Sequence, residues 1–249
     1  MERQEIGRIA HRDHPVAAPL SDASVHRLLE RQLRRCPNSS ALDLGCGEAA
    51  WLVRALTMHP NLQAIGVDTD PAALDDGRRA AERAGVEGRL ALHHADVREF
   101  EAADSFDAVL SVGATYAFGG LLPTLEAVRP LLAPGGTLLL GECYWEDGQP
   151  TDHAREFFGD DLTDLSGVLA TLRTAGWWPI AGHTSTREEL DTYEWSWTGS
   201  LTDWALDQPP GPDRDQALAA ATRHRHQWLT EYRDGFGFVT LLLRPDVTA

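Results

Sequence analysis

The segment Ala41–Glu48 (ALDLGCGE) combines a carboxylate with two closely spaced glycines. Gly45 and Gly47 predict a tight turn that a ligand can approach closely, because neither residue has a side chain in the way. Asp43 ends an apolar run, where an unpaired carboxylate is costly to bury. A carboxylate at this place would repel a pyrophosphate and attract an ammonium group. The segment therefore favours a ligand with a cationic end.

A second interpretation of the same segment is a dinucleotide site. Gly45-x-Gly47-x-x-Ala50 satisfies the fingerprint GxGxx(G/A), and Asp68 follows at a distance suited to a ribose-binding acid. Asp43 opposes this interpretation, because its charge would face the phosphates. The absence of lysine from the chain also opposes it, since it excludes the Tyr-Lys dyad of many dehydrogenases. A nicotinamide enzyme is thus the weaker alternative.

Further motifs recur in order along the chain, and together they resemble the class I S-adenosylmethionine-dependent methyltransferases. The resemblance covers residues 39–145 by motif, and residues 162–182 and 237–243 at the level of fold. The motifs are Asp43-Leu44-Gly45-Cys46-Gly47, Gly66-Val67-Asp68, His94-Ala95-Asp96-Val97, Phe106-Asp107-Ala108-Val109 and Leu132-Ala133-Pro134-Gly135-Gly136.

This resemblance implies S-adenosylmethionine as the cofactor. It places Asp43 near the methionine amino end, Asp68 against both ribose hydroxyls, and Asp96 with Val97 at the adenine. Cys46 is expected to be a small filler rather than a nucleophile, and Asp107 to be structural. The expected cofactor-binding residues are Asp43, Gly45, Cys46, Gly47, Asp68, Thr69, Asp96, Val97 and Ser111.

The methyl acceptor is expected beyond the carboxyl ends of the fourth and fifth strands, where ligands bind in doubly wound sheets. Glu142 ends an apolar strand and could act as a base or counter-ion, with a solvated strand end as the alternative. His14 could also act as a base. The candidate catalytic residues are Glu142, Tyr116 and His14, and the candidate substrate-binding residues are Tyr116, Glu142, Tyr144, Trp145 and Trp195. No metal site is expected.

Alternating apolar runs and helical patterns predict an α/β fold with a doubly wound, mostly parallel, seven-stranded Rossmann-like sheet whose last strand is antiparallel. Expected strands cover residues 39–44, 62–67, 90–94, 106–112, 137–141, 177–182 and 237–243. Expected helices cover residues 22–35, 48–58, 71–84, 121–132, 162–175, 187–207 and 213–234.

The expected organisation is a single methyltransferase domain over residues 1–249. Residues 39–182 and 236–244 form its Rossmann-like core, and residues 1–38 form an N-terminal lid or helix. Residues 186–235 form a helical insertion between two neighbouring strands, far longer than a hairpin needs. A stripe in it (Tyr193, Trp197, Leu201 and Trp204) is expected to pack in a core, while Trp195 lies off the stripe. The insertion is predicted to be a lid, with rigid decoration or a homodimer contact as alternatives.

The composition of the chain argues against several classes of partner and of chemistry. The chain has 22 basic and 38 acidic residues and a net charge of −16, which disfavours nucleic acid. Because every basic residue is arginine, Schiff-base and phosphate-loop lysine chemistry are excluded. Cys36, Cys46 and Cys143 form no CxxC pair, so a disulfide framework is not expected. No membrane-spanning run or signal peptide is evident, so a cytoplasmic location is expected.

The function expected from the sequence is methyl transfer from S-adenosylmethionine to nitrogen or oxygen of a small-molecule acceptor. Carbon methylation is an alternative within the same enzyme class. A catalytically inactive cofactor-binding scaffold or regulatory protein is an alternative from another class, because the three acids Asp43, Asp68 and Asp96 concern only the cofactor.

Overall fold

The computed structural model describes residues 1–34, 40–146 and 162–246. The expected element boundaries at Arg35 and Ser39, and Cys36, lie outside the described residues. The chain forms two compact units. The helical unit consists of Met1–Leu20, Cys143–Leu165 and Ser185–Phe238, and the sheet unit consists of Ser21–Glu142, Ser166–Thr184 and Val239–Ala249.

In the described part of the chain, seven strands form one sheet in the order β3-β2-β1-β4-β5-β7-β6. The pairs β1–β2, β1–β4, β2–β3 and β4–β5 are parallel, and β6–β7 is antiparallel. This confirms the predicted Rossmann-like fold with an antiparallel last strand. The strands are β1 (Ser40–Leu44), β2 (Gln63–Asp68), β3 (Leu90–His94), β4 (Phe106–Val112), β5 (Leu132–Trp145), β6 (Trp177–Thr184) and β7 (Phe236–Pro245).

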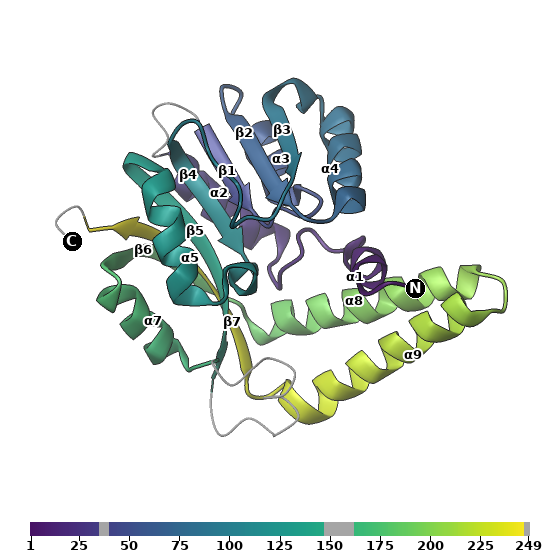
Figure 1. Ribbon diagram of the computed structural model, residues 1–249. Coiled ribbons are helices and arrows are strands. Elements are labelled where there is room, and N and C mark those ends of the chain that lie inside the picture. The colour runs from purple at the N-terminus through teal and green to yellow at the C-terminus, as the bar shows by residue number, and fades with distance from the viewer. Residues whose placement is uncertain (35–39, 147–161, 247–249) are drawn as a thin grey trace. The chain divides into compact units, whose positions relative to one another are not determined.

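Helices cover both faces of the sheet, as parallel pairing requires. Helices α2, α3 and α4 lie in a row on one face, and α5 and α7 lie on the other (Figure 1). The bounds are α2 (Asp22–Leu33), α3 (Ala50–Met58), α4 (Pro71–Ala84), α5 (Leu121–Val128) and α7 (Leu165–Thr174), with short 3₁₀ turns η1 (Glu87–Arg89), η2 (Thr115–Phe118) and η3 (Arg129–Leu131).

The sequence explains these helix ends locally. The Asp70 carboxylate accepts hydrogen bonds from the first amides of α4, and Pro71 occupies the first helical position, where no amide hydrogen is needed. Gly85 ends the same helix in the left-handed conformation. The predicted helix over 121–132 is too long, because α5 ends at Val128 and the chain tightens into η3 before β5 begins.

Strand β5 is longer than the predicted strand over 137–141. Phe106 pairs with Leu132 and Ala108 pairs with Thr137, so four residues of β5 bulge out opposite Asp107. The expected Pro134-Gly135-Gly136 turn is therefore a bulge inside the strand rather than a break before it, and Gly135 has a φ of 83°.

The helical unit contains α8 (Arg187–Asp207), α9 (Pro212–Gln227) and the π-helical turn η4 (Trp228–Tyr232), which together match the predicted insertion helices. Helix α1 (Arg3–His11), which the sequence interpretation did not include, packs on α8 (Figure 1). The core formed between these helices confirms part of the expected stripe. Leu201 is fully buried in this core, and Trp197 and Trp204 pack against the core.

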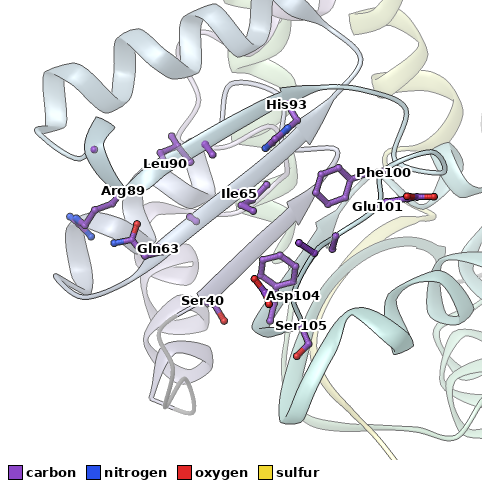
Figure 2. Close-up of a pocket in the computed structure, with 16 residues that line it drawn as sticks. Ser40, Gln63, Ile65, Arg89, Leu90, His93, Phe100, Glu101, Asp104 and Ser105 are labelled. Carbon is purple, nitrogen blue, oxygen red and sulfur yellow. The ribbon is translucent and has the colours of Figure 1, made fainter.

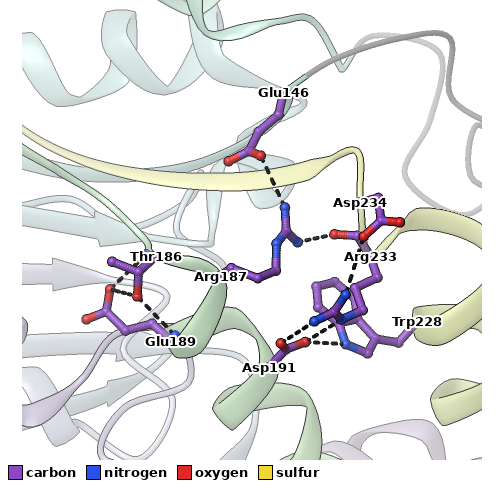
Figure 3. A network of polar contacts seen from close by, with 8 residues as sticks. All are labelled: Glu146, Thr186, Arg187, Glu189, Asp191, Trp228, Arg233 and Asp234. Carbon is purple, nitrogen blue, oxygen red and sulfur yellow. Dashed lines mark hydrogen bonds and ion pairs between the residues drawn. The ribbon is translucent and has the colours of Figure 1, made fainter.

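A polar network fixes the start of α8 to the end of η4 (Figure 3). The Arg233 guanidinium makes two hydrogen bonds of 2.8 and 2.7 Å to the Asp191 carboxylate, which also accepts from the Trp228 indole at 3.1 Å. Arg187 donates to Glu146 at 3.1 Å and to the Arg233 carbonyl. These bonds close the base of the α8–α9 hairpin.

No helix among the described residues is long and apolar enough to cross a membrane.

Candidate active site

The glycine turn after β1 has the geometry that the sequence predicted. The amides of Gly45 and Cys46 both donate to the Val67 carbonyl, at 2.9 and 3.1 Å. Gly45 has a φ of 86°, and a Cβ added to it would lie 2.6 Å from the Ala114 Cβ. Gly47 also has a positive φ, of 51°. Position 45 therefore accepts only glycine. Neither Gly45 nor Gly47 has a side chain that could block the approach of a ligand to the backbone of the turn.

Asp68 holds this turn from the end of β2. Its Oδ2 accepts from the Gly47 amide at 2.8 Å, and its Oδ1 accepts from the Asp70 amide at 2.9 Å. Each carboxylate oxygen has a second lone pair, so these bonds still allow the carboxylate to accept two ribose hydroxyls. The sequence interpretation did not predict that Asp68 stabilises the glycine turn, because its hydrogen bond to Gly47 joins residues far apart in the chain.

Asp43 lies in β1, two residues before Gly45, with only 2% of its surface exposed. Its Oδ2 has no hydrogen-bond partner among the described residues. Burial, together with the nearby charge of Asp68, raises the pKa of Asp43 to about 7. A buried carboxylate in this condition is stabilised by a cation, so the residue fits the methionine ammonium group of S-adenosylmethionine.

Cys46, between the glycines, is buried, and its side chain fills space beside β2: a Cβ on Gly66 would lie 2.8 Å from the Cys46 sulfur. Burial and the charges of Asp43 and Asp68 raise the pKa of this thiol far above its ordinary value. A neutral, packed thiol supports the expected role as a filler.

Asp96 has a partner that the sequence interpretation did not include. Arg98 donates to the Asp96 carboxylate from Nε, at 3.0 and 3.2 Å, and from its backbone amide, at 2.9 Å. These bonds lower the pKa of Asp96 to about 2. Val97 beside it is buried.

The two remaining cofactor candidates differ in exposure. Thr69 is exposed, and its carbonyl accepts from the His94 Nε2 at 3.1 Å. Ser111 is fully buried within β4. Asp107, which was excluded from the site, is buried near the start of β4 and accepts from the amide and hydroxyl of Ser40.

The acceptor candidates fall in both units. In the sheet unit, Tyr116 lies in η2 with 82% of its surface exposed, and Glu142 is half-buried near the end of β5. In the helical unit, the Tyr144 ring is buried against Gly237, where a Cβ would lie 2.3 Å from it. Trp145 is also buried, and its ring meets the Phe236 ring edge-on at 6.1 Å.

Two further candidates belong to the helical unit. His14 is half-buried, its Nδ1 lies 2.8 Å from the Val16 carbonyl, and its ring meets the Tyr193 ring edge-on at 5.1 Å. Trp195 lies on α8 with 55% of its surface exposed, and the Arg225 guanidinium sits 5.1 Å from its ring centre. Trp195 is therefore off the packed stripe, as predicted.

Sequence reasoning placed Tyr193 in the core stripe and assigned no role to His11, Glu194 or His224. The structure pairs them in the helical unit by two hydrogen bonds of 2.7 Å, one between His11 and Tyr193 and one between His224 and Glu194. No spacing in the sequence could reveal them, because the partners come from three separate segments.

A pocket of about 520 Å³ occurs in the sheet unit, lined by residues that begin strands β1 to β4, such as Ser40, Gln63, Leu90 and Phe106 (Figure 2). Ligands of doubly wound sheets bind beyond the opposite, carboxyl ends of the strands. None of the predicted cofactor residues lines this pocket, so it is distinct from the glycine turn.

Comparison with known proteins agrees with this geometry. Residues 36–193 match the family model described as a methyltransferase domain. The uncharacterised protein YjhP of Escherichia coli is 26% identical over 96% of this chain and 97% of its own. A crystal structure of an S-adenosylmethionine-dependent methyltransferase from Geobacter sulfurreducens, in complex with S-adenosylhomocysteine, is 25% identical. It covers 97% of this chain and 98% of its own, with a TM-score of 0.88.

A methyltransferase from Thiobacillus denitrificans, also in complex with S-adenosylhomocysteine, has the same fold, with a TM-score of 0.88 at 23% identity over 99% of both chains. The family match covers more than half of the chain, and the site residues fit the cofactor that the family uses. The chain therefore belongs to the methyltransferase domain family and is a class I S-adenosylmethionine-dependent methyltransferase.

Proposed function

We propose that this enzyme transfers the methyl group to nitrogen or oxygen of a small-molecule acceptor. The net charge of −16 opposes a polyanionic substrate such as a nucleic acid. Among the described residues, the sequence added between β6 and β7 is a helical hairpin, α8–α9, and not a basic recognition domain. We also propose that the enzyme works in the cytoplasm and that the hairpin serves as a lid.

The observation that carries the cofactor half of the proposal is the buried Asp43 beside the open glycine turn. When bound, S-adenosylmethionine supplies a sulfonium methyl group whose carbon an acceptor lone pair can attack, with S-adenosylhomocysteine as the leaving group. Asp43 would hold the ammonium group, and Asp68 would accept from the ribose hydroxyls. Asp96 with Val97 would contact the adenine, and these contacts would fix the cofactor at the strand ends.

On the acceptor side, we propose Glu142 as the base or counter-ion. The sequence placed it at the strand end, but β5 continues to Trp145, so Glu142 lies within the strand, where the sheet would orient its carboxylate. Tyr116 and His14 are the further catalytic candidates, and Tyr144, Trp145 and Trp195 are proposed to contribute packing surface for the acceptor. An acceptor that loses no proton needs no base, and Glu142 would then act through its charge alone.

The proposal predicts that Glu142→Gln lowers kcat by at least about tenfold and leaves the dissociation constant of S-adenosylhomocysteine within about twofold, which corresponds to a loss confined to acceptor chemistry. Glu126→Gln is the matched control, because Glu126 is an exposed carboxylate of the same unit. Methyl transfer is measured with isotopically labelled S-adenosylmethionine and a library of small amines, phenols and alcohols.

Three outcomes separate the candidate functions. A labelled product with the methyl group on carbon would favour the C-methyltransferase alternative. Tight cofactor binding without any transfer, and without slow cofactor hydrolysis, would favour the scaffold alternative. Unchanged turnover in Glu142→Gln across pH would remove this residue from the chemistry.

A further inference from the structure

The connection between β3 and β4, residues 95–105, contains no helix, although every other crossover between parallel strands of the described chain has one (Figure 1). Helices α3 and α4 cover one face of β2 and β3. A Cβ on Gly66 would lie 2.7 Å from Leu92 and 3.1 Å from Leu52 of α3, so Gly66 points to this covered face. Ile65 precedes Gly66 in β2 and therefore points to the opposite face. On that face the two strands meet an irregular segment instead of a helix.

A pocket of about 520 Å³ lies between this opposite face and the connection (Figure 2). The strand register places Ser40 beside Gln63 and Ile65 beside Ala91, so residues of three neighbouring strands form one wall. Residues 100–105 form a second wall. The volume falls in the range of small-molecule sites, about 300–1,000 Å³.

Several side chains that line this pocket are apolar and only partly covered. Ile65 and Phe100 are half-buried, and Ala91 is exposed. The Phe100 ring faces the His93 ring, with 5.6 Å between the ring centres and 58° between the ring planes (Figure 2). Covering exposed apolar surface is favourable, and the face of an aromatic ring attracts a cation. The pocket therefore suits a ligand with an apolar body and a positive group near Phe100.

The charged residues that line the pocket differ in what they can still bind. The Arg89 guanidinium donates to three backbone carbonyls of residues 56–62, at 2.9 to 3.2 Å, so three of its five N–H donors are used there. Glu101 and Asp104 follow Phe100 in the connection and are exposed. Neither carboxylate makes a hydrogen bond or an ion pair within the described residues. Two available carboxylates beside an aromatic ring favour a ligand that donates hydrogens and carries positive charge.

This pocket is separate from the methyl-transfer site. Among the described residues that line it, none is a candidate for cofactor or acceptor binding. All of these lining residues belong to the sheet unit. The cofactor and a ligand of the pocket can therefore be bound at the same time.

We propose that this pocket, here called the β2–β3 pocket, binds a small primary amine with an apolar body. The apolar body covers Ile65, Ala91 and the Phe100 ring, and the ammonium group donates to the carboxylates of Glu101 and Asp104. A carboxylate or phosphate ligand would be repelled by these two groups, and an alcohol would gain no ion pair. The site does not depend on which acceptor is methylated.

The test uses the full chain saturated with S-adenosylhomocysteine and titrated with three matched probes: 3-phenylpropylamine, 3-phenylpropan-1-ol and 3-phenylpropionate. Protein NMR spectra give both the dissociation constant of each probe and the amides that respond to it. Shifts are expected in residues 63–65, 89–93 and 100–105. The amine should bind at least about threefold more tightly than the alcohol and at least about tenfold more tightly than the acid.

Two variants alter the pocket in different ways. The double variant Glu101→Gln/Asp104→Asn should weaken amine binding at least about threefold and leave alcohol binding within about twofold. Ala91→Trp, which adds bulk from the exposed side of β3, should weaken both the amine and the alcohol at least about tenfold. Glu126→Gln on α5 and Ala84→Trp at the end of α4 are the matched controls, because both residues are exposed and lie outside the pocket. Both controls should leave amine binding unchanged.

Four results would overturn the inference: equal or tighter binding of the alcohol or acid, shifts confined to residues outside the pocket, no saturable shifts with the amine, or unchanged amine affinity in a folded pocket variant. The alcohol separates recognition of charge from a packing defect. A defect in the double variant would weaken the alcohol and the amine alike, whereas loss of the carboxylates should affect the amine alone.

Discussion

Asp43 is the residue at which cofactor binding and pH are expected to be linked. It is buried, its Oδ2 has no hydrogen-bond partner in the described chain, and its pKa is raised to about 7. In the folded enzyme without cofactor it therefore binds a proton up to nearly neutral pH. Only the ionised form can hold an ammonium group, so cofactor binding must expel that proton.

The affinity for S-adenosylhomocysteine should rise by about tenfold per pH unit below pH 7 and level off above it. The amino group of the ligand stays protonated through this range, so the slope reports the protein group. Asp43→Asn should weaken binding and flatten the slope, and calorimetry at about pH 5, pH 6 and pH 7 measures both. A steep slope in the variant would assign the proton to another residue.

The same shift predicts a stability effect of opposite sign. The folded-state pKa lies above the unfolded value of 3.8, so the folded state binds more protons between the two values and loses stability as pH rises through this window. Above about pH 7 the full penalty remains, on the order of a few kcal/mol. Asp43→Asn should therefore melt higher than the wild type at about pH 8 without cofactor, with little difference near pH 3. Equal melting temperatures at both pH values would show that the carboxylate carries no such penalty.

Asp68 has two roles that one substitution affects together. Asp68→Ala removes acceptors for the ribose hydroxyls and should weaken cofactor binding by about 2–4 kcal/mol, since charged hydrogen bonds contribute about 1.5–3 kcal/mol each and water replaces part of them. It also removes the acceptor of the Gly47 amide, so urea unfolding should show a loss of stability as well. Calorimetry on the folded variant separates the two losses, and unchanged affinity would assign the ribose to a different acid.

At the scale of elements, the glycine turn between β1 and α3 offers a matched pair of glycines. Both Gly45 and Gly47 have positive φ, which costs a non-glycine residue about 1 kcal/mol or more. Only Gly45 also meets a neighbour, because its Cβ would lie 2.6 Å from the Ala114 Cβ, whereas Gly47 has open space. Gly45→Ala should thus lower the free energy of unfolding by at least about 2 kcal/mol more than Gly47→Ala. Equal losses in urea unfolding would mean that the turn shifts to relieve the contact.

The elements were predictable where a single local pattern decides them. Strand β4 and helices α4 and α8 begin and end where their apolar runs and turn residues indicate. Strand β5 exceeds its predicted range because its neighbour β4 tolerates a bulge, which depends on pairing rather than on the local sequence. Helix α1 was missed because its stability comes from packing on α8, far away in the chain.

The same distinction applies to the site. Asp43, Asp68 and the two glycines could be predicted because the cofactor site is built from residues that follow strands in order. The contact of Arg98 with Asp96 and the pairing of His11 with Tyr193 could not be predicted. Hydrogen bonds between particular side chains produce no periodic pattern in the sequence.

At the scale of the whole molecule, the chain divides into a sheet unit with the predicted cofactor residues and a helical unit that contains the α8–α9 hairpin. Strands β5 and β7 run from one unit into the other. The N-terminal region divides as well. Residues 1–20 belong to the helical unit, whereas α2 belongs to the sheet unit, where Gln32 donates to the Val109 carbonyl at 3.1 Å.

The division into two units specifies which helices should respond if the insertion is a lid. Excluding water favours displacement at a sulfonium, because water competes as a nucleophile and solvates the acceptor lone pair. Lids come from the less stable parts of a fold, and the hairpin is closed at its base largely by half-exposed ion pairs such as Asp191–Arg233. Hydrogen exchange in α1, α8 and α9 should therefore slow by about tenfold or more when S-adenosylhomocysteine and a methyl acceptor identified from the library are both present. Exchange in α2 should change little, because Gln32 bonds it to β4 within the sheet unit. Equal protection of the hairpin with and without ligands would make it rigid architecture, and the dimer-contact alternative would then be tested by the oligomeric state in solution.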